Sequence, residues 1–144
     1  MDVDDNPTKD HIKRRITDGV VKKRKPIRPS TSRADIYVTR ERRKFNGHLQ
    51  RARKLLVDRH YPHITIHGLG AAIQQAIQLA NAIKASIGSN VVSMDVSTDT
   101  VTLYDDVVPQ DNDSKIVTQA RQNSAIHIKM TLVDSVRSKI NAKK

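Results

Sequence analysis

The feature that most constrains this chain is a long stretch almost without charge. Between positions 61 and 94 the only Lys, Arg, Asp or Glu is Lys84. Residues 63–67 alternate between polar and apolar side chains, as in a strand with one buried face. A turn with two glycines follows, and apolar residues then recur at helical spacing over 71–87. We therefore expect a strand, a tight turn and a helix that is covered on more than one side.

The rest of the chain supplies the partners for this unit. A strand and a helix are expected before it, and a long strand with a bulge or bend near 97–100 is expected after it, followed by a last strand. The expected order is β-α-β-α-β-β. This predicts an α+β two-layer sandwich with two helices packed on one face of a four-stranded mixed sheet. The additional elements are expected at residues 35–38, 45–56, 92–103 and 125–133.

We expect three regions. Residues 1–33 form a basic and disordered arm, because apolar positions are sparse and three prolines interrupt it. Residues 34–133 form the folded domain, and 134–144 form a short basic tail. No apolar run reaches the length of a membrane span, and the first residues contain no apolar run typical of a secretory signal.

Charge is distributed unevenly along the chain. Residues 1–60 hold 18 Lys and Arg against 8 Asp and Glu, whereas residues 61–144 hold 8 against 7. A basic front half favours a polyanion partner such as a nucleic acid, although a solvated tail is the alternative. Clusters within the arm suit contact with RNA phosphates or a nuclear import signal, and their members are Lys13, Arg14, Arg15, Lys22, Lys23, Arg24 and Lys25.

Composition excludes several classes of site. The chain has no cysteine, which removes disulfides, thiol nucleophiles and cysteine-ligated zinc. Four aromatic residues are too few for an RNA-binding surface built on stacked rings. His63 and His67 would lie about 13 Å apart on a strand, too far to share a metal ion. Because the acids fall in turns and the histidines along strands, we expect no catalytic pair, no metal and no cofactor.

The two expected strand–helix turns are candidate RNA-binding sites. The first is basic, and cations at a helix start oppose the helix dipole, which suggests contact with phosphates. The second, Gly68–Gly70, fits either an anion site at a helix N-terminus or a close approach of strand and helix. Two basic residues of the last strand region complete the set of candidates, which is Arg40, Arg42, Arg43, Lys44, Gly68, Leu69, Gly70, Arg121 and Lys129.

The long neutral helix is a candidate for partner contact. Its second side is expected to be covered either by another protein or by another element of the same fold. The residues expected to meet a partner are Leu79, Ala80, Ile83 and Ile87.

Three motifs resemble the Alba superfamily, and within it most closely the twenty-kilodalton Alba-like subunits of eukaryotic ribonuclease P and ribonuclease MRP. They are the strand at 35–38, the run from Ile66 to Ile77 and the run from Arg121 to Ile128. The resemblance covers about residues 34–132 and implies the same β-α-β-α-β-β fold. It also implies a heterodimer with a second Alba-like subunit of about twenty-five kilodaltons, bound to the ribonuclease P and MRP RNA beside other protein subunits.

The resemblance further implies a nuclear and nucleolar location and a role in precursor tRNA 5′ processing and precursor rRNA processing, with catalysis by the RNA. Archaeal Alba proteins have paired lysines where this chain has Arg42 and Arg43, and Arg-Gly-Arg where it has Leu69-Gly70-Ala71. The alternative is a general Alba-type protein that packages DNA or RNA, against which the neutral second turn argues. A small enzyme acting on a phosphorylated ligand at Gly68–Gly70 is a third hypothesis.

Overall fold

The structure is a computed structural model that describes residues 19–28, 32–110 and 115–143. It is an α+β fold with a five-stranded mixed sheet in the order β1-β4-β5-β3-β2. β2 is parallel to β3, whereas β3 is antiparallel to β5 and β1 is antiparallel to β4. The elements are β1 Val20–Lys23, β2 Asp35–Tyr37, α1 Phe45–Arg53, β3 His63–Leu69, α2 Ile73–Ile87, β4 Val92–Val108, β5 Val117–Leu132 and α3 Asp134–Asn141.

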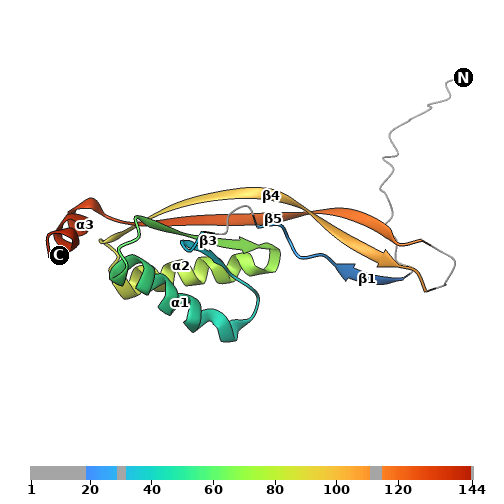
Figure 1. Cartoon of the computed structure of the whole chain (residues 1–144), viewed down its shortest axis with the longest axis horizontal. Helices are drawn as coiled ribbons and strands as arrows, with labels where there is room; N and C mark the ends of the chain where they lie inside the picture. The colour runs from blue at the N-terminus through green and yellow to red at the C-terminus, as the bar shows by residue number, and fades with distance from the viewer. Residues whose placement is uncertain (1–18, 29–31, 111–114, 144) are drawn as a thin grey trace, which may run out of the picture. The chain divides into compact units, whose positions relative to one another are not determined.

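The chain divides into two compact units. The larger comprises Pro26–Leu103 and Arg121–Lys144, and the smaller comprises Met1–Lys25 and Tyr104–Ala120, so that β4 and β5 each contribute to both. Within the larger unit, α1 and α2 lie side by side along one side of β3 (Figure 1). This confirms the predicted α+β class and the order β-α-β-α-β-β of residues 34–133.

The core lies between the helices and the sheet of the larger unit. Ile64 and Ile66 are fully buried on β3, as the alternation in the sequence predicts. Leu79 and Ile83 of α2 pack into the same cluster. The helix ends at Gly88, whose φ of 135° lies in a region that side chains other than glycine rarely adopt. The glycine that follows the apolar stripe therefore sets the helix end, as expected.

The prediction of four strands is wrong, because Val20–Lys23 form a fifth strand. Its residues pair with Asp105–Val108 of β4. All four side chains of β1 are exposed, so that backbone pairing forms the strand and no apolar alternation marks it in the sequence. For these residues the prediction of disorder is therefore wrong. The basic cluster Lys13–Arg15 lies outside the described residues.

The last strands also extend beyond their predicted limits. β4 runs on to Val108, and β5 begins at Val117, ahead of the alternating segment that predicted it. None of the residues added to β5 is buried, which weakens the apolar signal there, whereas the part added to β4 buries Asp105 and Val107. The tail beyond residue 133 begins with a helix, α3, that the sequence did not predict. Among the described residues, no helix is long and apolar enough to cross a membrane.

Candidate nucleic-acid interface

The turn between β2 and α1 is exposed and basic. Arg42–Lys44 form a single 3-10 turn that leads directly into α1. The side-chain amide of Gln75, on α2, donates a 2.7 Å hydrogen bond to the carbonyl of Arg40 and so fixes the turn against that helix. Arg40, Arg42, Arg43 and Lys44 are all exposed, so the structure brings these four candidates together at the surface.

Glu41 partly neutralises this turn. Its carboxylate lies 3.0 Å from the Arg43 guanidinium and 3.2 Å from the Lys44 ammonium. Hydrogen bonds from Arg43 and then from Lys44 lower the pKa of Glu41, so the carboxylate stays ionised. Within the described chain Arg40 and Arg42 make no ion pair. Exposed pairs of this kind are weak, and phosphates can compete for the same cations.

The basic surface continues along α1. One cavity of about 340 Å³ has Arg28, Lys44 and Arg51 in its wall. A second, of about 230 Å³, is lined by Arg33, Arg51, Lys54, Leu55 and Arg59. We call the cations of the first turn and of these two cavities the basic surface, and its members are Arg28, Arg33, Arg40, Arg42, Arg43, Lys44, Arg51, Lys54 and Arg59.

Five of these nine residues were missed as binding candidates in the sequence. Arg28 and Arg33 fall within the predicted arm, whereas Arg51, Lys54 and Arg59 are not among the residues predicted to contact RNA. A signal was present, because Lys44, His48 and Arg51 are spaced four and three residues apart and so share one face of a helix. The spacing could not show that Arg28 joins them, since that contact depends on the path of the chain before β2.

Two residues in the wall of the larger basic cavity each carry a buried polar atom without a partner. They are Nε2 of His48 and Oγ1 of Thr39, neither of which makes a hydrogen bond with the described part of the chain. Burial, followed by the charges of Arg51 and Lys44, lowers the pKa of His48. Because buried polar groups nearly always have partners, a cavity with such groups beside three cations suits an anionic ligand.

The second strand–helix turn has a different construction. A Cβ at Gly68 would lie 2.7 Å from Cβ of Ala76 and 3.0 Å from the carbonyl oxygen of Ala72, so the glycine permits a close approach of β3 and α2. Gly70 has a φ of 54°, and a Cβ there would meet the side-chain amide of Asn123 at 2.5 Å. Of the two alternatives that the sequence left open, close packing accounts for both glycines.

The structure does not bring Arg121 and Lys129 to the basic surface. Both lie on β5, where Lys129 is exposed and stands opposite Thr65 of β3. Neither residue lines the two basic cavities.

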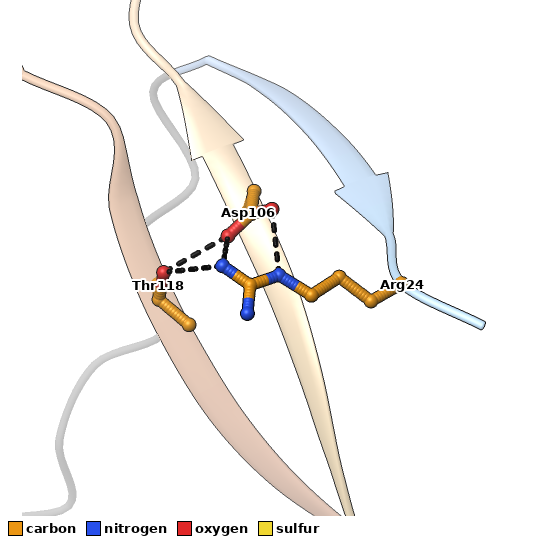
Figure 2. Close-up of polar contacts among 3 residues, drawn as sticks. All are labelled: Arg24, Asp106 and Thr118. Atoms are coloured by element: carbon orange, nitrogen blue, oxygen red, sulfur yellow. Dashed lines mark hydrogen bonds and ion pairs between the residues drawn. The ribbon is translucent and has the colours of Figure 1, made fainter. Parts of the chain in front are cut away.

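In the smaller unit, Arg24 is bound within the chain (Figure 2). Its Nε and Nη2 donate to the two carboxylate oxygens of Asp106, at 2.8 Å and 2.7 Å, and Nη2 also contacts Oγ1 of Thr118 at 3.2 Å. The bonded carboxylate raises the pKa of Arg24, and the guanidinium lowers the pKa of Asp106. Lys22, Lys23 and Lys25 are exposed, so Arg24 differs from its neighbours in having its charge neutralised.

A histidine cluster lies on the face of the sheet opposite the buried isoleucines. His67 and His127 are partners in the β3–β5 register, with their Nδ1 atoms 2.7 Å apart, and Nε2 of His67 lies 2.9 Å from a carboxylate oxygen of Asp35. The expectation that no histidine lies beside an oriented acid is therefore wrong. The contact depends on the pairing of three strands, which the sequence does not display.

This cluster does not provide a free general base at His67. Both ring nitrogens are engaged, Nε2 by Asp35 and Nδ1 by His127, so neither is left to accept a proton from a substrate. Within the described residues, no group of three or more His, Asp or Glu side chains is placed to hold a metal ion. The arrangement fits a fixed polar wall for the cavity described below.

The expected partner contact through the inner stripe of α2 is wrong. Leu79, Ala80 and Ile83 are buried in the core of the same chain, and Ile87 packs against that core. The sheet and α1 cover this helix on two sides, which explains its low charge without a partner. Its outward side is exposed, and Ile77 there retains 42% of its accessible surface.

Comparisons with known proteins identify the family. Residues 31–129 match the family described as "Rpp20 subunit of nuclear RNase MRP and P". The chain is 38% identical over 116 residues to the proteins named ribonuclease P protein subunit p20 of Mus musculus and Homo sapiens, covering 76% of this chain and 81% of each relative. Alba from Thermoplasma volcanium superposes with a TM-score of 0.49 at 17% identity, over 67% of this chain and 98% of that one. The chain therefore belongs to the family of Rpp20 subunits of nuclear RNase MRP and P.

Proposed function

We propose that this protein is a non-catalytic RNA-binding and assembly subunit of ribonuclease P and ribonuclease MRP. It contacts the RNA of both particles as a heterodimer with a second Alba-like subunit. In this role it acts in the nucleus and nucleolus, in precursor tRNA 5′ processing and in precursor rRNA processing. Membership of the family supports the place in the particles, and the basic surface supports the contact with RNA.

The basic surface is the observation that carries this proposal. Its nine cations lie before β2, in the first turn, on α1, in the π-helical segment Lys54–Asp58 that follows it and at Arg59, on a chain whose net charge is +11. Cations that are exposed and spread over a helix face bind phosphates in preference to base edges. Such contacts release counterions, so the affinity for RNA should fall steeply with salt and depend little on paired sequence.

The histidine cluster supports a non-catalytic role. Asp35 and His67 retain only about a tenth of their side-chain exposure, and His67 has no ring nitrogen available to a substrate. A general base must reach the proton that it removes. In the proposed role the cluster is therefore a fixed polar group in which only Nε2 of His127 is left open within the described residues, and the chain contributes binding while another component of the particle supplies the chemical step.

The outward side of α2 is the proposed contact with the second Alba-like subunit. Its exposed residues carry no charge, and Ile77 is the large apolar side chain among them. Lys84, seven residues after Ile77, is partly exposed at one end of this side. A neutral strip with an exposed isoleucine can be desolvated at a low electrostatic cost, which suits the core of a protein interface. The strip consists of Gln74, Ile77, Gln78, Asn81 and Ala85.

The salt dependence of RNA binding tests the proposed function. We expect the variant with Arg42, Arg43 and Lys44 changed to Ala to lose up to about 2.7 units of the slope of log affinity against log salt, at roughly 0.9 for each phosphate contact on a duplex. The matched control changes Arg137, Lys139 and Lys143 to Ala, which removes the same charge from the C-terminal region. Equal losses in the two variants would mean that the basic surface has no special role.

A further inference from the structure

A third cavity adjoins the larger basic cavity. It has a volume of about 220 Å³ and shares Arg28, Tyr37 and Thr39 with that cavity. We call it the apolar cavity, because much of its remaining wall is formed by Ile27, Leu69, Val101 and Ala125. All of these residues belong to the larger unit. One compact unit thus places a cationic cavity and an apolar cavity next to each other.

Aromatic rings fix one side of the apolar cavity. The rings of Tyr37 and His67 stack with centroids 4.5 Å apart and planes 17° from parallel. The Arg28 guanidinium lies 4.8 Å from the centre of the Tyr37 ring. Asp35 and His127 hold His67 through both of its nitrogens. A wall of flat, immobilised groups suits a flat ligand, because the fold already holds these groups in place and binding does not have to order them.

His127 supplies a hydrogen-bonding group in this wall. When His67 is neutral, its Nε2–H donates to the Asp35 carboxylate, so its Nδ1 accepts from Nδ1–H of His127. Nε2 of His127 then carries a lone pair, and it makes no hydrogen bond with the described part of the chain. Together with the Asp99 carboxylate, this nitrogen gives the largely apolar wall its acceptors. Such a wall matches a nucleobase, which offers flat faces and an amino or imino N–H at its edge.

The basic cavity matches the phosphate of the same nucleotide. The three cations of its wall, Arg28, Lys44 and Arg51, outnumber its one carboxylate, Asp35, which is engaged by His67. Two further wall residues, Thr39 and His48, each carry a buried polar atom without a partner, and a turn of either side chain would bring that atom to the cavity. Each of those two groups can donate to a phosphate oxygen. Since Thr39 also lines the apolar cavity, the two cavities are close enough for the two ends of one nucleotide.

We propose that the two cavities together bind one unpaired nucleotide of the RNA, with its phosphate in the basic cavity and its base in the apolar cavity. This inference rests on the proposed function, because it specifies how the RNA is held. It adds a requirement that phosphate contacts alone do not impose, namely that one base at a defined position be unpaired and available.

The test uses the full chain and a hairpin RNA with a single-stranded loop, together with versions in which each loop base is removed in turn. We expect one abasic position to lower the affinity roughly 5- to 150-fold, the range for removing a base from contact with aromatic groups. Changing Val101 to Trp fills the apolar cavity and should cause the same loss with intact RNA, after which the abasic position should have no further effect. The control, Val96→Trp, changes an exposed valine on the same strand.

Thr39→Val tests the phosphate end without filling a cavity. It removes a buried hydroxyl that has no partner in the described chain, so the melting temperature should stay the same or rise while RNA affinity falls. Thr65→Val is the matched control on β3 and should change neither. A hydroxyl with a structural role alone would show the opposite pattern, with lower stability and unchanged affinity.

The outcomes separate this inference from the proposed function. If affinity depends on salt but on no loop base, and Val101→Trp binds as well as Val96→Trp, the nucleotide site is wrong and the proposed function stands. If the intact RNA does not bind at all, both are wrong. Should Val101→Trp fail to fold, as judged by circular dichroism, the abasic series and Thr39→Val decide the question without it.

Discussion

The two strand–turn–helix units of this protein, β2–α1 and β3–α2, share an architecture and differ in what their side chains do. The turn into α1 is exposed and carries four cations, whereas the turn into α2 is neutral, and its Gly68 is buried. The single buried residue of α1 itself is Ala52, whereas α2 buries Ala76, Leu79, Ala80 and Ile83. The first unit therefore presents charge to solvent, and the second unit contributes more of its helix to the core.

This difference predicts which property of the protein a substitution in each unit will change. The α2 unit is covered by the sheet and by α1, so its inner residues contribute to stability through burial. The α1 unit is held in part by the hydrogen bond from Gln75 to the carbonyl of Arg40, and it leaves its cations in solvent. We expect changes in the β3–α2 unit to alter stability, and changes in the β2–α1 unit to alter binding.

The largest expected effect separates the two sides of α2. Ile83→Asp places an unpaired charge among fully buried side chains and should cost several kcal/mol, roughly 3–5 or more, which prevents stable folding. Ile77→Asp on the outward side should fold normally and should weaken only the proposed pairing with a second subunit. Thermal unfolding together with size-exclusion chromatography of the co-expressed pair distinguishes the two. A folded Ile83→Asp protein would contradict the assignment of this stripe to the core.

A second prediction compares one glycine from each unit. Gly68→Ala should destabilise the fold by about 1–3 kcal/mol, because its Cβ would collide with Ala76 and with the backbone at Ala72. Gly47→Ala in α1 should stabilise it by about 1 kcal/mol, because no atom lies within 4 Å of the added Cβ and alanine favours a helix. Chemical denaturation measures both. If Gly68→Ala were as harmless as Gly47→Ala, close packing would not explain the glycine turn.

The third prediction concerns the second turn after a positive charge like those of the first turn has been added to it. Ala71 is exposed in the neutral turn, so Ala71→Arg should fold normally and give that turn a cation. We expect the slope of log affinity against log salt to steepen by about 0.9, the contribution of one new phosphate contact. Ala142→Arg adds the same charge at an exposed position near the C-terminus and serves as the control. An equal change in both variants would show only the effect of net charge.

The smallest expected effect is a pH dependence that arises from the basic surface. Burial, Arg51 and Lys44 lower the pKa of His48 in the folded state, so the unfolded chain binds the proton more readily. The stability that this group contributes is therefore present above its ordinary pKa of 6.5 and is lost as the pH falls below that value. His48→Gln should lose less stability than the wild type between about pH 7.5 and 5.5, as measured by melting temperature. If the melting temperatures of the wild type and of His48→Gln differed by the same amount at both pH values, protonation of His48 would not affect stability.

The same prediction can be sharpened with RNA. A phosphate in the basic cavity would offset the charges of Arg51 and Lys44 and favour the protonated form of His48. RNA affinity should then increase modestly as the pH falls through the range in which His48 takes up its proton. His48→Gln should remove that increase, and an RNA affinity with the same pH dependence in both proteins would place the phosphate elsewhere.

Most of the fold and part of the candidate site can be predicted from the sequence. The order of the elements in 34–133, the buried face of β3 and the end of α2 at Gly88 each follow from local spacing, because a strand repeats every two residues and a helix every 3.6. The basic first turn can be predicted in the same way, since its cations are consecutive. Local patterns of this kind are visible wherever neighbours in the sequence share one environment.

Only the tertiary structure decides the remaining features. β1 has no buried face, so its backbone pairing with β4 leaves no pattern in the sequence. Whether the stripe of α2 meets a partner or its own core depends on which elements pack against it, and here the sheet and α1 do. The contact between Asp35, His67 and His127 joins three strands whose register is a property of the whole sheet. Local spacing in the sequence determined the elements within residues 34–133 and their charge. Packing between distant segments determined β1 and the cavities, because no local spacing records which surfaces meet.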